Sequence, residues 1–135
     1  MSRLIESMKE IMNVAKRLKM FHLPTCSTCK SAIKALKQQG YELELQDIKA
    51  SPPTAEELGN LIPLSGLPIA KWFNVSGEVY REMGLKDKFQ AMSEEDKIKL
   101  LASNGMLIKR PIVTDGSRVS IGFREQDFGP MWYNL

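Results

Sequence analysis

The sequence has few residues suited to metal binding or to a disulfide scaffold. Its 135 residues include two cysteines and one histidine. One cysteine pair and one histidine cannot alone supply the four ligands of a structural zinc ion, and two cysteines are too few for a disulfide-rich fold. The sequence also contains no apolar run that could span a bilayer and no glycine-rich phosphate loop. We therefore expect no bound metal, no bound cofactor and no membrane insertion.

Charge is unevenly distributed along the chain. The formal net charge of +3 comes from residues 1–20, which hold five basic and two acidic residues, whereas residues 21–135 hold fourteen of each sign. A neutral domain is not expected to bind nucleic acid directly. Residues 1–17 have apolar residues at helical spacing, which predicts either an amphipathic helix packed on the domain or in a dimer contact, or a frayed leader. The N-terminus lacks the apolar stretch of a secretory signal, which favours a cytoplasmic location.

The two cysteines, Cys26 and Cys29, form a Cys-x-x-Cys motif. A short apolar strand over 18–23 precedes the motif, and a helix over 30–39 follows it. A helix N-terminus offers unpaired N–H groups and positive dipole charge, which favour a thiolate. We therefore expect Cys26 to attack and Cys29, about one helical turn away, to resolve the mixed disulfide. The alternative is that Cys29 is a small core residue. In that case external glutathione, and not Cys29, would react with the adduct on Cys26.

The rest of the sequence predicts an ordered series of elements. A strand over 41–47 is followed by helices between about 52 and 104, two of which begin with capping patterns at Thr54 and Ser93. Asp115-Gly116 predicts a β-hairpin, and a last helix is expected over 124–132. The order β-α-β, helices, then β-β-α predicts an α/β, thioredoxin-like fold with a helical insertion at about 52–104. The expected domain spans 18–135.

Several motifs in this order resemble the ArsC/Spx family of thioredoxin-fold proteins. They are PTCSTCK at 24–30, PP at 52–53, FNVSG at 73–77, YREMGL at 80–85, IKRPIV at 108–113 and IGF at 121–123. The resemblance covers about residues 18–133. This family includes arsenate reductases, Spx-type transcription regulators and uncharacterised relatives.

The resemblance implies roles for individual residues. Cys26 matches the nucleophilic cysteine, Arg110 an arginine that binds the oxyanion, and Pro111 the cis-proline that faces the active site. His22 falls where arsenate reductases carry a histidine near the cysteine. From the residues alone, His22 has the alternative of a structural hydrogen bond and Arg110 that of a surface salt bridge. Lys30 either favours the Cys26 thiolate or points into water.

The sequence also departs from the arsenate reductase pattern. Those enzymes use three arginines around the oxyanion, and the second and third fall near Asn74 and Gly122 here. Arg124 lies close to the latter position but out of register. Asn74 either contacts a substrate or belongs to a turn over 74–77. Arsenate reductases of this type also tend to have serine where this chain has Cys29.

These observations predict a cytoplasmic thiol–disulfide oxidoreductase of the ArsC kind, with Cys26, Cys29 and Arg110 as catalytic residues. The expected substrate is a disulfide or arsenate, and its contacts are expected from Arg110, Pro111, His22, Asn74 and Lys30. Glutathione with glutaredoxin, or thioredoxin, would restore the Cys26–Cys29 dithiol. The alternative is an Spx-like redox sensor that binds RNA polymerase through the same motif.

Overall fold

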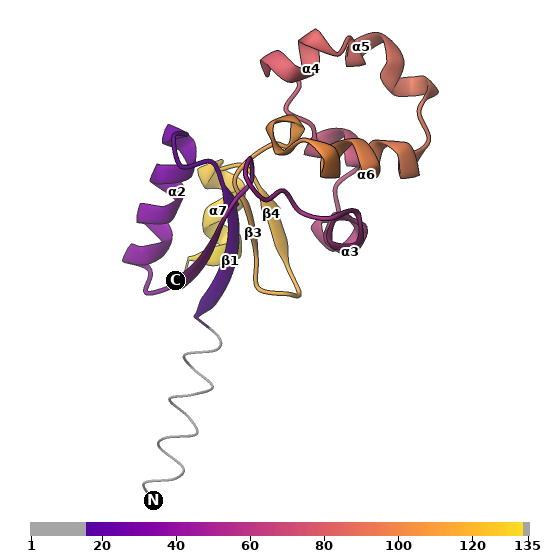
Figure 1. The fold of residues 1–135 in the computed structure, drawn as a ribbon. Helices are drawn as coiled ribbons and strands as arrows, with labels where there is room; N and C mark the ends of the chain where they lie inside the picture. Colours follow the sequence, from indigo (N-terminus) through magenta and orange to yellow (C-terminus); the bar gives the residue numbers. More distant parts are fainter. Residues whose placement is uncertain (1–15, 134–135) are drawn as a thin grey trace, which may run out of the picture.

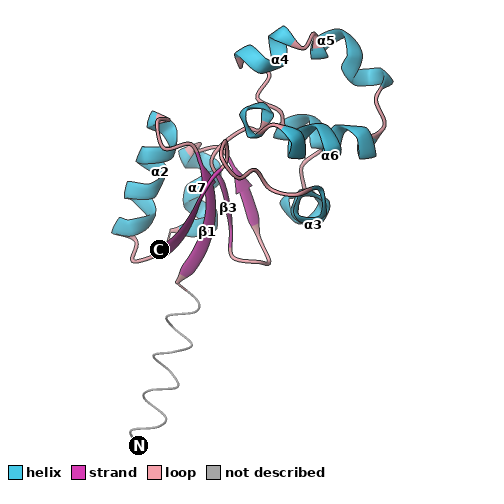
Figure 2. Cartoon of the chain, viewed as in Figure 1, coloured by secondary structure: helices cyan, strands magenta, loops and turns pink. Residues whose placement is uncertain are grey.

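The computed structural model describes residues 16–133. Its elements, in chain order, are β1 (Arg17–His22), α2 (Ser27–Gln38), β2 (Glu42–Asp47), α3 (Ala55–Ser65), η1 (Ile69–Trp72), α4 (Glu78–Glu82), α5 (Leu85–Lys88), η2 (Phe89–Ala91), α6 (Glu94–Ser103), η3 (Gly105–Leu107), β3 (Ile112–Thr114), β4 (Val119–Ile121) and α7 (Glu125–Trp132). Here η denotes a 3₁₀ helix. The order confirms the predicted β-α-β, helices, β-β-α sequence (Figure 2).

A four-stranded sheet in the order β2-β1-β3-β4 forms the centre of the fold. Strand β2 is parallel to β1, whereas β3 is antiparallel to β1 and to β4. The β1–β2 pairing requires a crossover connection, which α2 supplies. The hairpin predicted at Asp115-Gly116 joins β3 to β4, where the Asp115 side chain accepts hydrogen bonds from the backbone N–H groups of Ser117 and Arg118 at 2.9 and 2.8 Å.

Helices cover both faces of the sheet (Figure 1). Side chains alternate along a strand, so Leu18 and Met20 of β1 pack with α2 and α7, whereas Phe21 packs on the opposite face with residues of α3 and α6. Neighbouring Val113 and Ile112 of β3 divide in the same way. The central strands thus separate two apolar cores.

Local sequence signals set the starts of two long helices in the insertion. Thr54 and Glu57 form a reciprocal capping box, with N···O distances of 3.0 and 3.1 Å. The Ser93 hydroxyl accepts a hydrogen bond from the Asp96 N–H at 3.1 Å. Each cap satisfies a backbone donor that a helix leaves unpaired. Both predicted helix starts are therefore confirmed.

A segment inside the insertion pairs with the chain that follows the insertion. Phe73 and Ile108 form an isolated antiparallel bridge. The Asn74 N–H donates to the Leu107 carbonyl at 2.7 Å, and the Lys109 N–H donates to the Trp72 carbonyl at 2.8 Å. This pairing places Asn74 next to the segment that leads into β3.

Some expected boundaries differ from the structure. The helices of the insertion include the 3₁₀ helix η1, whereas α5, η2 and η3 have no individual counterpart in the prediction. Arg17, assigned from sequence to the N-terminal segment, is the first residue of β1. Apart from residues 16 and 17, the helix or leader predicted over 1–17 lies outside the described residues. None of the helices within residues 16–133 is long and apolar enough to cross a membrane.

Candidate functional site

Cys26 lies where the chain passes from β1 into α2. It is the N-cap residue of α2, and its own N–H donates to the Leu23 carbonyl at 2.9 Å. Its carbonyl accepts the first hydrogen bond of the helix, from Lys30 N–H at 3.1 Å. The side chain is half-buried. The N-terminus of a twelve-residue helix therefore lies directly beneath an accessible sulfur.

The surroundings of Cys26 favour its thiolate. Partial burial by itself raises the pKa of the Cys26 thiol. The backbone N–H and thiol of Cys29, the backbone N–H of Thr28 and the positive charge of Arg110 outweigh burial, so that the pKa lies below its ordinary value. Helix N–H donors and a nearby guanidinium both stabilise negative charge on sulfur.

Cys29 has the opposite character. It is completely buried in the first turn of α2, and both cysteines are free thiols. Burial is the largest effect and raises the pKa of Cys29 to about 11. The backbone hydrogen bond with Leu23 opposes this rise, the hydrogen bond to Cys26 and the charge of Cys26 add to it, and the charge of Arg110 opposes it. One thiol is thus prepared to ionise while its neighbour stays protonated.

Cys26 opens into a cleft of about 280 Å³. The chain passes from β1 into the N-terminus of α2 at one end of the sheet (Figure 1), and Cys26, which lines the cleft, lies in this connection. The lining residues come from four separate parts of the chain: Cys26, Thr28, Asn74, Lys109, Arg110, Gly122 and Phe123. The structure therefore brings together Cys26, Arg110 and Asn74 of the predicted site.

Arg110 presents an unused hydrogen-bond donor in this cleft. Its Nη1 donates to the Ile108 carbonyl at 3.4 Å, but its buried Nε has no hydrogen-bond partner within residues 16–133. The same part of the chain shows no ion pair for Arg110, contrary to the alternative of a surface salt bridge. The Arg110–Pro111 peptide is cis, as the resemblance implies, and Pro111 is buried.

Both positions at which the resemblance expects further arginines line the cleft, as Asn74 and Gly122. Asn74 also begins a turn, in which its carbonyl accepts from the Gly77 N–H at 3.1 Å. Arg124 lies outside the lining residues and pairs with Asp127 at 3.8 Å. Arg110 is therefore the one guanidinium that lines the described cleft.

Three other predicted contacts, Pro111, His22 and Lys30, are not among the residues that line the cleft. His22 is the last residue of β1 and does not line the cleft, although its Nδ1 atom is buried and lacks a partner within the described chain. Lys30 is exposed and also lies outside the lining residues. Closeness to Cys26 in the sequence therefore does not place either side chain in the cleft.

Sequence reasoning did not identify Lys109 or Phe123 as cleft residues. Lys109 directly precedes Arg110, and Phe123 follows Gly122. Two motifs already singled out, IKRPIV and IGF, contain them, so the signal was present. Their side-chain positions depend on the pairing of 108–111 with neighbouring strands, which the sequence alone did not supply.

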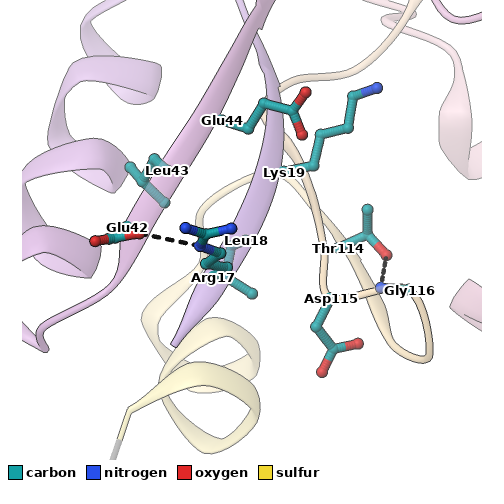
Figure 3. Close-up of a pocket in the computed structure, with 9 residues that line it drawn as sticks. All are labelled: Arg17, Leu18, Lys19, Glu42, Leu43, Glu44, Thr114, Asp115 and Gly116. Atoms are coloured by element: carbon teal, nitrogen blue, oxygen red, sulfur yellow. Dashed lines mark hydrogen bonds and ion pairs between the residues drawn. The ribbon is translucent and has the colours of Figure 1, made fainter. Parts of the chain in front are cut away.

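A larger hollow of about 670 Å³ lies at the opposite end of β1 (Figure 3). Most of its charges are paired: Arg17 with Glu42 at 3.1 Å and Lys19 with Glu57 at 3.7 Å. No cysteine lines it; the lining residues are Arg17, Leu18, Lys19, Glu42, Leu43, Glu44, Thr114, Asp115 and Gly116. Across residues 16–133, no three His, Cys, Asp or Glu residues are placed to hold a metal ion. The Cys26 cleft is the better candidate site.

Comparisons with known proteins agree with this fold. The protein YusI of Bacillus subtilis (strain 168) is 47% identical over 115 residues, which cover 85% of this chain and 98% of YusI. A crystal structure of a putative ArsC family related protein from Bacteroides fragilis shares 43% identity and a TM-score of 0.80, with 84% of this chain and 96% of that chain covered.

More distant relatives carry two different functional names. An arsenate reductase of Neisseria meningitidis (serogroup A, strain DSM 15465 / Z2491) is 27% identical, with 78% of this chain and 89% of the relative covered. A global transcriptional regulator Spx of Streptococcus pyogenes serotype M1 is 26% identical, with 80% and 79% covered. The ArsC family model matches residues 21–131. This chain belongs to the ArsC family and has its thioredoxin-like fold.

Proposed function

We propose that the protein is a thiol–disulfide oxidoreductase in which Cys26 is the nucleophile and Cys29 the resolving thiol. The observation that carries the proposal is the placement of the two thiols: half-buried Cys26 lines the cleft at the N-terminus of α2, and Cys29 lies buried in the first turn behind it. This placement agrees with a lowered pKa for Cys26 and a pKa raised to about 11 for Cys29. A thiolate is the attacking species in disulfide exchange. The ArsC family relatives named arsenate reductase support a redox activity.

The reaction has two exchange steps. The Cys26 thiolate attacks one sulfur of a substrate disulfide, which forms a mixed disulfide and releases the other half as a thiolate. Cys29 then loses its proton to solvent or to the leaving sulfur and attacks Cys26, which releases the second half. Two electrons pass from the protein dithiol to the substrate, and the Cys26–Cys29 disulfide remains.

The position of Cys29 suits the second step. Before reaction, the Cys26 thiolate contributes to raising the pKa of Cys29 through its charge and a hydrogen bond. Once Cys26 becomes part of a neutral mixed disulfide, both of these contributions disappear. Cys29 then ionises more readily at the point where its attack is required.

An external dithiol must reduce the enzyme after each turnover. We propose thioredoxin, or glutaredoxin with glutathione, as this reductant. Both act by thiol–disulfide exchange, so the mechanism needs no bound cofactor. A reducing cytoplasm would keep both cysteines in the thiol form found in the structure.

A disulfide substrate fits the cleft better than arsenate. Tetrahedral oxyanions are held most effectively by several guanidinium groups in bidentate geometry. The described cleft contains Arg110, while Asn74 and Gly122 stand where the resemblance expects two more arginines. Attack on arsenate would be slow with only one such group.

A second candidate function is redox sensing of the Spx type. Relatives named Spx at 26% identity support it. In that role the Cys26–Cys29 disulfide would form once on exposure to oxidant and alter binding to RNA polymerase, without repeated turnover. The balanced charge of residues 21–135 gives no electrostatic reason for such a complex.

A coupled assay tests the proposal. Reduced protein is supplied with hydroxyethyl disulfide or arsenate, together with NADPH and either the thioredoxin or the glutaredoxin–glutathione system. We expect NADPH consumption above the protein-free rate with the disulfide and little with arsenate. No turnover with either substrate, together with co-purification of RNA polymerase only under oxidising conditions, would instead establish the sensor.

A further inference from the structure

The cleft around Cys26 carries two positive side chains and no carboxylate. Lys109 and Arg110 line it, and the remaining residues apart from Cys26 are neutral. Within residues 16–133, neither cation takes part in an ion pair, and Arg110 Nε lacks a hydrogen-bond partner. Unpaired positive charges next to a reactive thiolate attract an anionic group.

The backbone of Lys109 is held firmly at the edge of the cleft. Its N–H donates to the Trp72 carbonyl at 2.8 Å, beside the Asn74–Leu107 hydrogen bond of 2.7 Å. Its side chain is exposed, in contrast to the half-buried Arg110. The ammonium group can therefore reach a ligand in the mouth of the cleft while the main chain stays fixed.

Gly122 leaves the space that the Lys109 side chain uses. A Cβ atom at residue 122 would lie 3.3 Å from Lys109 Cε, and Gly122 has a φ of +79°, which disfavours other residues. The Gly122 N–H also donates to the Pro111 carbonyl at 2.9 Å, which fixes it next to the Arg110–Pro111 peptide. A side chain of its own at this position would crowd Lys109.

We infer that Lys109 selects disulfides that carry a carboxylate near the sulfur, such as disulfides of small acidic thiols. An ammonium is a compact point charge without the fork that grips a tetrahedral oxyanion. One carboxylate arm of a substrate can instead pair with Lys109 while Arg110 stays next to the reacting sulfurs. This inference rests on the proposed oxidoreductase function and names the substrate class for the same site.

The test compares three small disulfides of different charge at low ionic strength: dithiodipropionate, which is anionic, hydroxyethyl disulfide, which is neutral, and cystamine, which is cationic. Oxidation of reduced protein is followed for the wild type, Lys109→Gln and Lys109→Arg. Lys34→Gln is the matched control, because Lys34 is an exposed lysine of α2 outside the cleft. Together, the three variants show whether an effect depends on a positive charge at residue 109 or only on the total positive charge of the protein.

We expect Lys109→Gln to slow the reaction with dithiodipropionate by roughly two- to fivefold, as an exposed ion pair implies, and to accelerate the reaction with cystamine. The rate with hydroxyethyl disulfide should change least, because this neutral substrate reports only the thiolate fraction of Cys26, and Lys109→Arg should restore the anionic preference. Added salt should remove the difference. An equal change with all three disulfides, or the same effect in Lys34→Gln, would overturn the inference.

A second measurement separates this inference from the proposed function. Alkylation of Cys26 by iodoacetate, an anion, and by iodoacetamide, which is neutral, requires no redox step. Their rate ratio cancels any change in the thiolate fraction, and Lys109→Gln should lower it. If wild-type protein reacts with no disulfide, the oxidoreductase proposal fails; if it reacts normally and the ratio is unchanged in Lys109→Gln, only the role of Lys109 fails.

Discussion

The two ends of the central sheet differ in charge pairing as well as in the size of their hollows. The hollow at the start of β1 has about 670 Å³ of space, whereas the Cys26 cleft has about 280 Å³. In the larger hollow, Arg17 pairs with Glu42 (Figure 3), and Lys19 pairs with Glu57. In the smaller cleft, Lys109 and Arg110 have no ionic partner among the described residues and face a thiol. Unpaired positive charges beside a thiol, and not the volume of the hollow, identify the candidate site.

The two thiols of the Cys-x-x-Cys motif also differ in their surroundings, although they are close neighbours. Cys26 meets helix N–H donors and a guanidinium, which lower its pKa despite partial burial. Cys29 lies wholly inside the apolar core, and burial is the main reason that its pKa is raised. The same residue type thus gains two roles from position alone.

The largest expected effect comes from Cys26→Ser. The variant should reduce turnover in the coupled disulfide assay to the protein-free rate, because it removes the thiolate that attacks the substrate. Arg17→Gln, in the hollow at the other end of β1, is the control and should retain activity. Measurable turnover in Cys26→Ser would remove Cys26 as nucleophile.

Cys29→Ser should stop the reaction one step later. Attack by Cys26 would proceed, but no buried thiol would resolve the product, so a mixed disulfide should accumulate. Intact-mass measurement after exposure to hydroxyethyl disulfide should show one added half-disulfide on the variant, and an internal disulfide in the wild type. An unmodified Cys29→Ser protein would show that Cys26 does not react on its own.

Arg110→Gln should have a smaller effect, expressed in the pH profile. The positive charge of Arg110 lowers the pKa of Cys26, so its removal should raise that pKa and shift the alkylation curve to higher pH. With iodoacetamide, the rate at pH 7 should fall by roughly two- to tenfold, while the rate well above the pKa stays unchanged. A profile that does not move would mean that helix donors alone hold the thiolate.

The smallest effect is expected in the hollow at the start of β1. Arg17 and Glu42 form an ion pair with both side chains 68% exposed. The double variant Arg17→Gln, Glu42→Gln should change the free energy of unfolding by less than about 1 kcal/mol and leave the Cys26 alkylation rate unaltered. If the double variant unfolded at the same urea concentration as the wild type but its Cys26 thiol were alkylated more slowly, the two ends of the sheet would be coupled.

Elements with strong local signals were predictable from the sequence. The capping residues Thr54 and Ser93, the Asp115-Gly116 hairpin and the strand before Cys26 each depend on a few neighbouring residues, and each is present in the structure. The short helices α5 and η2 span four and three residues. Such segments are too short to show a period, and only the surrounding insertion determines their shape.

The site was predictable only in part, because its members meet through tertiary pairing. Cys26 came from the motif, and Arg110 and Asn74 came from the family resemblance. Lys109 joins them through the bridge between residues 73 and 108 and through the space above Gly122. His22 and Lys30 are near Cys26 in sequence, but their side chains do not line the cleft.

The most direct test is the pH titration of the two thiols in wild-type reduced protein, followed by thiolate absorbance and by the iodoacetamide rate. We predict two separate transitions: one for Cys26 below the value of about 8.5 typical of free cysteine, and one for Cys29 at about 11. The Cys26→Ser variant should lose the lower transition. A single transition at or above the free-cysteine value would contradict the account.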